Sequence, residues 1–128
     1  MFLGRINTTP TVADTNIPIL VEFNTNSKIG YNGTTDEIVL RKMGLYNVDG
    51  AITATGAAGD VEINLLADGV VRRTFTATLA AADDFVTIPV VDAIRVIYDE
   101  FQNVADLSLQ TSLAGLTLTG TVRVEYVQ

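Results

Sequence analysis

Carboxylates are the abundant titratable side chains in this sequence, and they could serve as an acid–base pair or as ligands for a hard cation. Asp and Glu number 15 against 8 Lys and Arg. Carboxylates stand close together at three places: Asp83 with Asp84, Asp99 with Glu100, and Asp60 with Glu62. Neighbouring residues of a strand point to opposite faces, so proximity in sequence does not make a catalytic pair. We therefore interpret these carboxylates as solvated charges in turns and at strand edges.

A calcium site is the alternative for these carboxylates. Calcium takes about six to eight oxygen ligands, and no Asp-x-Asp-x-Asp-Gly loop is present to supply them locally. The sequence leaves open a site assembled from several loops, including Asp99, Glu100 and Asp106. Our expectation is that the protein has no metal and no cofactor.

The sequence contains no histidine and no cysteine. Histidine is the commonest general base and the usual transition-metal ligand, and a cysteine thiolate is a common enzymatic nucleophile. Their absence removes Ser/His and Cys/His dyads, disulfides and zinc–thiolate sites. We predict that the protein is not an enzyme.

The charge balance restricts the partners. The formal net charge of -7 repels phosphate backbones and anionic lipid, so we expect neither nucleic acid nor a membrane surface as a partner. The two basic pairs, Arg41-Lys42 and Arg72-Arg73, are interpreted as salt-bridge residues. Charged residues make up only 18 % of the chain, which predicts an oligomer, because buried subunit faces need few charges.

The N-terminal residues Met1 to Arg5 are followed by polar residues rather than by an apolar stretch of signal-peptide length. No run approaches the roughly 18 apolar residues of a membrane-spanning helix. We expect a protein made in the cytoplasm without a signal peptide.

Alternation of apolar and polar residues dominates the chain and predicts β-strands. The segment 60–65 places Val61, Ile63 and Leu65 on one face and polar residues on the other. Asp68-Gly69 follows between two alternating runs and predicts a two-residue type I′ hairpin turn, which needs positive φ at both positions. The strands predicted from such patterns cover residues 17–23, 29–31, 37–40, 44–53, 60–65, 70–79, 85–88, 94–98, 106–111 and 116–127.

These short strands and their turns predict the fold class and the domain organisation. About eight to ten antiparallel strands are typical of an all-β, two-sheet jelly-roll sandwich. Residues 1–16 are predicted to form a polar N-terminal arm, and residues 17–128 the jelly-roll domain. Pro18 cannot donate a ladder hydrogen bond and is expected at a strand start or edge, while Gly120 is expected to mark a bulge or bend.

The four tyrosines could line a shelf on which sugars stack. They stand at positions Tyr31, Tyr46, Tyr98 and Tyr126. However, Tyr46 shares its strand face with Val48, and Tyr126 shares its face with Val124. Their positions therefore favour the core or a subunit interface, where an amphipathic ring fits well.

Three segments, in order along the chain, resemble a known family. They are Thr11-Val12 with Asn16-Ile17-Pro18 and the strand that follows, Gly44-Leu45-Tyr46-Asn47-Val48, and Leu65-Leu66-Ala67-Asp68-Gly69-Val70. They resemble the jelly-roll superfamily of tumour necrosis factor (TNF) and the complement globular heads, in particular its bacterial and bacteriophage branch on virions and spore surfaces. That family shows a Gly-x-Tyr-x-Val/Phe strand, a hairpin ending Leu-x-x-(Asn/Asp)-Gly, and a closing strand like Thr121 to Tyr126. The resemblance spans roughly residues 11 to 127.

The resemblance implies a ten-strand TNF-like sandwich that forms a homotrimer through apolar and tyrosine-lined faces. Tyr46 falls on the motif tyrosine, and Tyr126 lies in the closing strand. We therefore expect Tyr46, Val48, Val124 and Tyr126 in the trimer interface. No collagen-like stalk is present, and no receptor or calcium site can be transferred from the family.

Together these points predict a non-enzymatic virion structural protein, a trimeric capsid decoration or fibre-head protein of a bacteriophage. Its partner would be the major capsid protein or another virion protein, held by the N-terminal arm as an anchoring strap. The alternative is a carbohydrate- or receptor-binding adhesion module on a phage tail or bacterial surface. A surface glycan would then contact the loops near Asn24 to Thr35 and Asp99 to Asn103.

Overall fold

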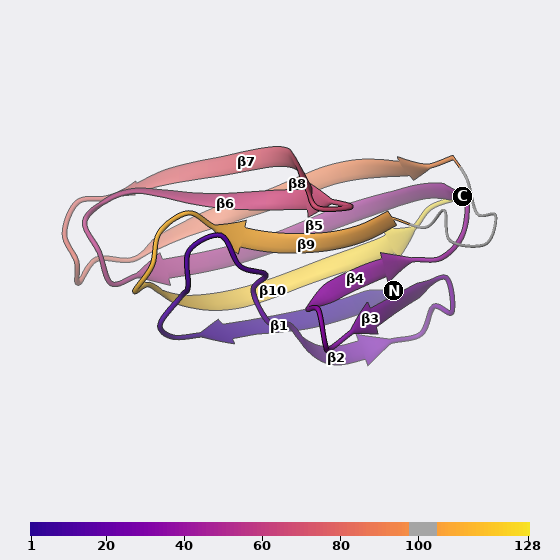
Figure 1. Ribbon diagram of the computed structural model, residues 1–128, viewed down its shortest axis with the longest axis horizontal. Coiled ribbons are helices and arrows are strands. Elements are labelled where there is room, and N and C mark those ends of the chain that lie inside the picture. The colour runs from indigo at the N-terminus through magenta and orange to yellow at the C-terminus, as the bar shows by residue number, and fades with distance from the viewer. Residues whose placement is uncertain (98–104) are drawn as a thin grey trace.

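The computed structural model describes residues 1–97 and 105–128, and these residues form ten β-strands (Figure 1). In chain order the strands are β1 Phe2–Thr8, β2 Leu20–Asn24, β3 Ile29–Asn32, β4 Glu37–Leu40, β5 Gly44–Thr55, β6 Gly59–Ala67, β7 Val70–Leu79, β8 Val86–Val96, β9 Ala105–Thr111 and β10 Thr117–Tyr126. Across the residues described, no helix is long and apolar enough to span a membrane.

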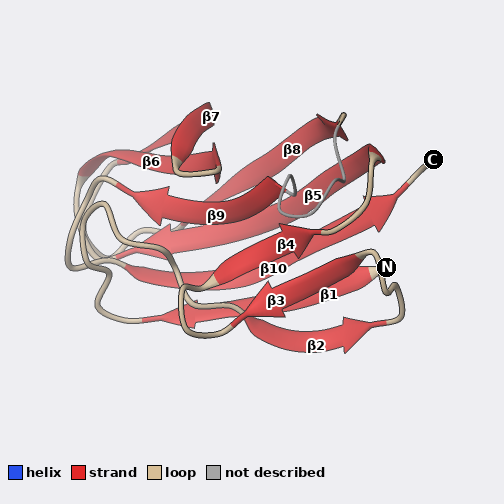
Figure 2. Cartoon of the chain, turned by 45° about the vertical axis from the view of Figure 1, so that its right-hand side comes forward, coloured by secondary structure: helices blue, strands red, loops and turns tan. Residues whose placement is uncertain are grey.

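The strands form two five-stranded antiparallel sheets. Sheet A has the order β2-β1-β10-β5-β8, and sheet B has the order β3-β4-β9-β6-β7. Figure 2 shows the sheets facing each other, with the connections gathered at the two ends of the sandwich. The predicted all-β, two-sheet jelly roll of antiparallel strands is confirmed.

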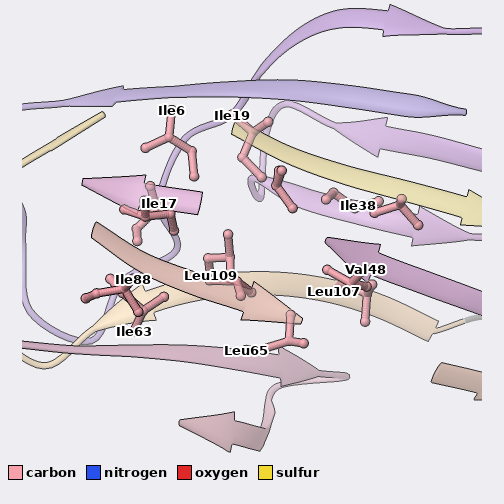
Figure 3. Close-up of a cluster of buried hydrophobic side chains, with 14 of the residues drawn as sticks. Ile6, Ile17, Ile19, Ile38, Val48, Ile63, Leu65, Ile88, Leu107 and Leu109 are labelled. Carbon is pink, nitrogen blue, oxygen red and sulfur yellow. The ribbon is translucent and has the colours of Figure 1, made fainter. Parts of the chain in front are cut away.

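The hydrophobic core fills the space between the sheets because each strand buries alternate residues. In β8, for example, Ile88, Val90 and Ile94 are buried, and the residues at the alternate positions are exposed. Asp92 is a polar residue on the buried side of this strand. Figure 3 shows isoleucines, leucines and a valine of both sheets in one cluster, including Val48 of β5 and Leu109 of β9.

The first strand corrects the predicted N-terminal arm. Residues 2–8 form β1, which lies between β2 and β10 in sheet A, and its Phe2 and Ile6 are buried. The prediction of an arm over residues 1–16 is therefore wrong for these residues. In the sequence, Phe2, Gly4 and Ile6 alternate with Leu3 and Arg5, as in a strand. The pattern is short and is followed by a long polar stretch, so the strand was not recognised.

Residues 9–19 connect β1 to β2, both strands of sheet A, and run along β9 of sheet B on the way. The Asp14 N–H donates to Thr111 O at 2.9 Å, and the Ile17 N–H donates to Leu109 O at 2.7 Å, so the segment lies along β9. Ile17 is buried although it belongs to no strand. The predicted strand 17–23 is accordingly shorter, and β2 begins at Leu20 after Pro18.

The hairpin prediction is confirmed. Asp68 and Gly69 have φ values of 52° and 79° and join β6 to β7. The two strands predicted at 85–88 and 94–98 are instead one strand, β8, and Tyr98 lies outside the described residues. Pro89 is tolerated within β8 because β8 is an edge strand and needs partners on one side only.

Gly120 is not at a bulge. It pairs in register with Ile52 of β5 and Ile6 of β1. Its φ is 155°, and a Cβ added there would lie 2.1 Å from the carbonyl oxygen of Ala51. Glycine is required at this position because the neighbouring backbone approaches closely.

Candidate interaction surface

Three of the four predicted interface residues lie in the core of the single chain. Tyr46 and Val124 are fully buried and Val48 is 1 % exposed. On the neighbouring strands β5 and β10, Val48 pairs with Val124 and Tyr46 with Tyr126. The interface assignment is wrong for Tyr46, Val48 and Val124, because side chains covered by sheet B present no surface to another copy.

Tyr126 is the exception and stays a prediction, since it is only half-buried. Its ring meets the Tyr46 ring edge-on at a centroid distance of 5.2 Å, and Lys28 Nζ lies 4.7 Å from its centroid. The Tyr46 hydroxyl donates to Lys42 O at 2.7 Å and accepts from the Lys42 N–H at 3.2 Å. Burial raises the pKa of Tyr46. These tyrosines therefore fix the connection between β4 and β5.

The described tyrosines do not form a sugar-binding shelf. Tyr31 lies in sheet B, where its hydroxyl donates to Asp36 Oδ1 at 2.9 Å and accepts from the Ile19 N–H at 3.0 Å. Burial and the neighbouring Asp36 carboxylate raise the pKa of Tyr31 to about 12. Tyr98 lies outside the described residues. Tyr31 therefore joins the segment before β2 to sheet B.

The outer face of sheet A is made largely of small, uncharged side chains. The outward side chains of β10, β5 and β8 include Thr119, Thr121, Asn47, Ala51, Thr53, Thr87, Pro89, Val91 and Ala93. Two pairs of charges on this face form ion pairs, Arg5 with Glu22, and Arg123 with Asp49 at 2.8 Å. Arg95 and Glu125 are also exposed on this face and form no ion pair within the described residues. Neither lysine of the sequence stands on these strands. A face with few charged side chains suits contact with another protein, because charged residues are depleted at the centre of interfaces.

Both edges of this face carry exposed apolar side chains. On β2, Leu20 is 62 % and Phe23 is 47 % exposed. Leu20 pairs with Arg5 and Phe23 with Leu3, so both side chains lie on the outer face. At the opposite edge, Val91 is 55 % and Ile97 is 62 % exposed. Exposed apolar side chains at both edges make this face a candidate for contact with another protein.

A groove of about 960 Å³ lies at the β8 edge. It is lined by Asn47, Asp49, Pro89, Val91, Ala93, Arg123 and Glu125 of sheet A and by Arg72, Arg73 and Phe75 of β7. Asp92, on the buried side of β8, accepts from Arg72 Nε at 2.5 Å and from Arg73 Nε at 3.1 Å. Arg72 Nη2 also donates to Ala93 O at 2.8 Å, which occupies a carbonyl of the edge strand. The groove is therefore bordered by a charge cluster that joins β7 to β8.

A β-bulge allows both arginines to reach Asp92. Leu65 pairs with Arg73 and Leu66 with Val71, so Arg72 is the extra residue of β7. Adjacent residues of a regular strand point to opposite faces, and a bulge re-aims one of them. The prediction that Arg72-Arg73 form salt bridges is confirmed. Its partner Asp92 was missed, because an inward carboxylate breaks the apolar pattern that identifies a strand.

The remaining carboxylates form no metal cluster within residues 1–97 and 105–128. Asp83 and Asp84 are exposed in the β7–β8 turn. Asp106 is half-buried, and burial, followed by the nearby Glu37 and Asp68 charges, raises its pKa. Asp99 and Glu100, the other residues of the alternative calcium site, lie outside the described residues.

No protein-family model and no curated protein matches the sequence. Solved structures do match in fold. The globular domain of zebrafish complement 1qA superimposes with a TM-score of 0.75 over 99 % of this chain and 96 % of that chain, at 8 % identity. Eiger TNF from S. frugiperda gives 0.72 over 98 % and 86 %, at 8 % identity. PRD1 vertex protein P5 gives 0.59 over 94 % of each chain, at 13 % identity.

The chain has the TNF-like jelly-roll fold. At these identities the similarity concerns the fold alone, and function must be argued from the surface.

Proposed function

We propose that this chain is a non-enzymatic structural protein of a virion, a capsid decoration or fibre-head protein of a bacteriophage, and that it works as a homotrimer. Copies contact one another through the outer face of sheet A and its two apolar edges. The trimer is the functional unit that presents the loops of the jelly roll.

The observation that carries the trimer is the position of the apolar patches at opposite edges of one sheet. Leu20 and Phe23 lie on β2, and Val91 and Ile97 lie six residues apart along the β8 edge. A patch that meets a different patch on the next copy makes a head-to-tail contact, and such contacts close into a ring when the rotation permits. The groove beside β8 gives the β2 edge of a neighbour a concave place to sit.

The small side chains between the patches support the same arrangement. Ala51 of β5 and Thr121 of β10, on strands between the two edges, let backbones of neighbouring copies approach closely. The ion pair of Arg123 with Asp49 keeps that region electrically neutral. Such a face can be buried against another copy without a partner of opposite charge.

The assignment to a virion rests on two similarities. The sequence motifs resemble the bacterial and bacteriophage branch of the superfamily, and the fold resembles that of PRD1 vertex protein P5. An acidic chain without histidine or cysteine fits a structural role better than a catalytic one.

Light scattering on the purified chain tests the trimer. The parent chain should have the mass of three copies, and Phe23→Lys or Val91→Lys should shift it to monomer while leaving the circular dichroism spectrum unchanged. Thr34→Lys, in an exposed turn of sheet B, is the matched control and should stay trimeric. A parent chain that is monomeric at all accessible concentrations would overturn the trimer.

Co-sedimentation with capsids tests the virion role. The chain is mixed with capsids of the virus that encodes it, purified without this protein, and pelleted through sucrose. Saturable binding in multiples of three per capsid site is expected. If the trimer forms but stays in the supernatant, and a glycan array binds it instead, the adhesion alternative replaces the decoration role.

A further inference from the structure

The turn between β3 and β4 contains the one Asn-Gly pair of the sequence, Asn32-Gly33, and both residues are exposed. An asparagine amide is an electrophile, and the backbone nitrogen of the next residue can attack it where the chain is able to bend. Glycine permits that bend best because it has no Cβ. The pair is therefore a place where the chain can modify itself, and the surrounding structure decides whether it does.

The Asn32 side chain is already folded back over the chain that follows it. Its Oδ1 accepts from the Thr34 N–H at 3.0 Å, which makes an Asx turn. That hydrogen bond polarises the side-chain carbonyl that would be attacked. It would also stabilise the negative charge that develops on Oδ1 during the attack, as a donor in an oxyanion hole does.

The Gly33 backbone has room to reach the reactive geometry. Strand β3 ends at Asn32, whose pairing with Glu37 is the last of the four pairs that join β3 to β4. Gly33 follows that pair, and in the part of the chain that the structure describes its N–H donates to no backbone carbonyl. A Cβ built on Gly33 would meet only a Tyr31 ring atom, at 3.9 Å. Neither the ladder nor packing therefore fixes this nitrogen in place.

Two other asparagines form the same turn and serve as internal references. Asn24 Oδ1 accepts from the Asn26 N–H at 3.1 Å, and Asn26 Oδ1 accepts from the Lys28 N–H at 2.9 Å. Their next residues are Thr25 and Ser27, whose side chains restrict the backbone and hinder the approach of its nitrogen. The turn before glycine is the one without this hindrance.

The two Asp-Gly pairs of the sequence could form the same ring but are held more firmly. In one pair, Gly50 lies inside β5 and pairs with strands on both sides. In the other, Asp68 exchanges two hydrogen bonds with Asp106: the Asp68 N–H donates to Asp106 O, and the Asp106 N–H donates to Asp68 Oδ1, both at 2.9 Å. An ionised carboxylate is also a poorer electrophile than an amide.

We propose that Asn32-Gly33 is a spontaneous modification site of the folded protein. The Gly33 nitrogen loses its proton to solvent base and attacks Asn32 Cγ. The bond from Cγ to Nδ2 breaks, the nitrogen takes up a proton and leaves as ammonia, and a succinimide ring remains. Water opens the ring at Cγ to give aspartate, or at the backbone carbonyl to give isoaspartate. The net reaction consumes one water, releases one ammonia and oxidises nothing.

Conversion loosens the hairpin of β3 and β4. The new carboxylate stands opposite Glu37, and like charges on facing strands destabilise a pair. Glu37 also lies near the carboxylate of Asp106, so the new charge adds to an acidic group. Isoaspartate inserts one carbon into the main chain at the last pair of a hairpin that has only four. β3 is the edge strand of sheet B and is held in the sheet by β4.

Peptide mapping by mass spectrometry tests the site, with the full folded chain stored at pH 7 and pH 9 in water enriched in heavy oxygen. Position 32 should take up one heavy oxygen at a rate that rises with hydroxide concentration. Asn24 and Asn26 should convert about tenfold more slowly, a difference of ~1.4 kcal/mol in the barrier. Gly33→Ala should slow Asn32 by a similar factor. An unconverted Asn32, or conversion no faster than that of Asn26, would overturn the proposal.

Hydrogen exchange on the stored chain tests the consequence for the fold. The β3 and β4 amides should exchange faster in the stored parent chain than in Gly33→Ala stored for the same time, whereas the amides of β5 and β10 should exchange equally in both. Equal exchange of β3 and β4 in the two chains, with Asn32 converted in the parent, would overturn the loosening of the hairpin.

The modification goes beyond the virion role and does not depend on it. β3 lies in sheet B, whereas the lateral contact proposed for the trimer uses the outer face of sheet A. Light scattering should therefore give the same mass for stored and fresh chains. A change of mass on storage that Gly33→Ala prevents would contradict the confinement of the effect to the hairpin.

Discussion

Arg72 of β7 reaches across the open side of the sandwich to Asp92 of β8, with Nε 2.5 Å from Oδ2. The same guanidinium donates from Nη2 to Ala93 O at 2.8 Å. One side chain thus ties the edge of sheet B to the edge of sheet A. It also occupies an acceptor that an incoming strand would use, which is one way in which edge strands avoid aggregation.

Arg72→Leu should therefore do more damage than Arg73→Leu. Replacing Arg72 removes a charged hydrogen bond to Asp92 and the hydrogen bond to the Ala93 carbonyl. Replacing Arg73 removes one contact with Asp92, at 3.1 Å. We expect Arg72→Leu to lower the free energy of unfolding by about 2 kcal/mol and Arg73→Leu by about 1 kcal/mol. Urea unfolding followed by fluorescence measures both, with the exposed Arg95→Leu as a control near zero. Equal losses for Arg72 and Arg73 would argue against the edge-carbonyl bond.

Gly120→Ala should destabilise the protein strongly. The new Cβ would meet Ala51 O, and a φ of 155° is unfavourable for a residue with a side chain. We expect a loss of about 3 kcal/mol or more in the free energy of unfolding. Gly33→Ala is the control, since its Cβ would meet only a Tyr31 ring atom at 3.9 Å, and it should change the stability by less than ~0.5 kcal/mol.

Tyr31 should make the fold sensitive to alkaline pH. Its pKa is about 12 in the folded protein and ~10 in an unfolded chain. The folded state therefore holds the proton more tightly, and stability is fully present below about pH 10 and falls as the pH rises toward 12. Urea midpoints measured from pH 9 to pH 12 should show this decline.

Tyr31→Phe is the matching variant. It should flatten the decline between pH 10 and 12 and, at pH 8, lower the stability by about 1–3 kcal/mol, because the Ile19 N–H loses its acceptor. Burial also raises the pKa of Tyr46, so part of the alkaline decline should persist in Tyr31→Phe. An unchanged pH profile would contradict the role of the Tyr31 hydroxyl.

Removing the negative charge of Asp106 should stabilise the folded protein. Burial and the charges of Glu37 and Asp68 raise its pKa, so the folded state favours the protonated form. The ionised Asp106 carboxylate therefore lowers the stability of the fold at neutral pH. This destabilisation disappears at low pH, where the carboxyl group is protonated. Asp106→Asn should raise the free energy of unfolding at pH 7 by about 0.5 kcal/mol and do nothing at pH 3. Thermal unfolding at the two pH values would decide this.

The sequence was sufficient for the fold class and for the hairpin at Asp68-Gly69, because both depend on short-range patterns of polarity and turn chemistry. It was also sufficient to place Tyr46 and Val48 on one face of a strand. It could not say whether that face meets sheet B or another copy. The assignment of Tyr46 and Val48 to a trimer interface came from the family resemblance. It required these side chains to lie on the outer face of sheet A, whereas they lie on the inner face, in the core.

The features that sequence reasoning missed depend on distant contacts. β1 is recognisable only once β10 lies beside it, and Asp92 is tolerated within an apolar strand only because a bulge brings Arg72 to it. The outer face of sheet A contains no motif at all. Its signal in the sequence is the run of threonine and alanine opposite the buried residues of β5 and β10, which a search for interaction surfaces could use.

The pairing of β1 with β10 also sets the order of events during synthesis. Phe2 lies opposite Val124, so β1 has no partner on that side until β10 has been synthesised. Contacts so far apart in sequence form slowly, and the waiting strand exposes Phe2 and Ile6 to aggregation. Sheet A is therefore completed only after β10 has been synthesised, and the yield of folded protein should depend on what protects β1 during that delay.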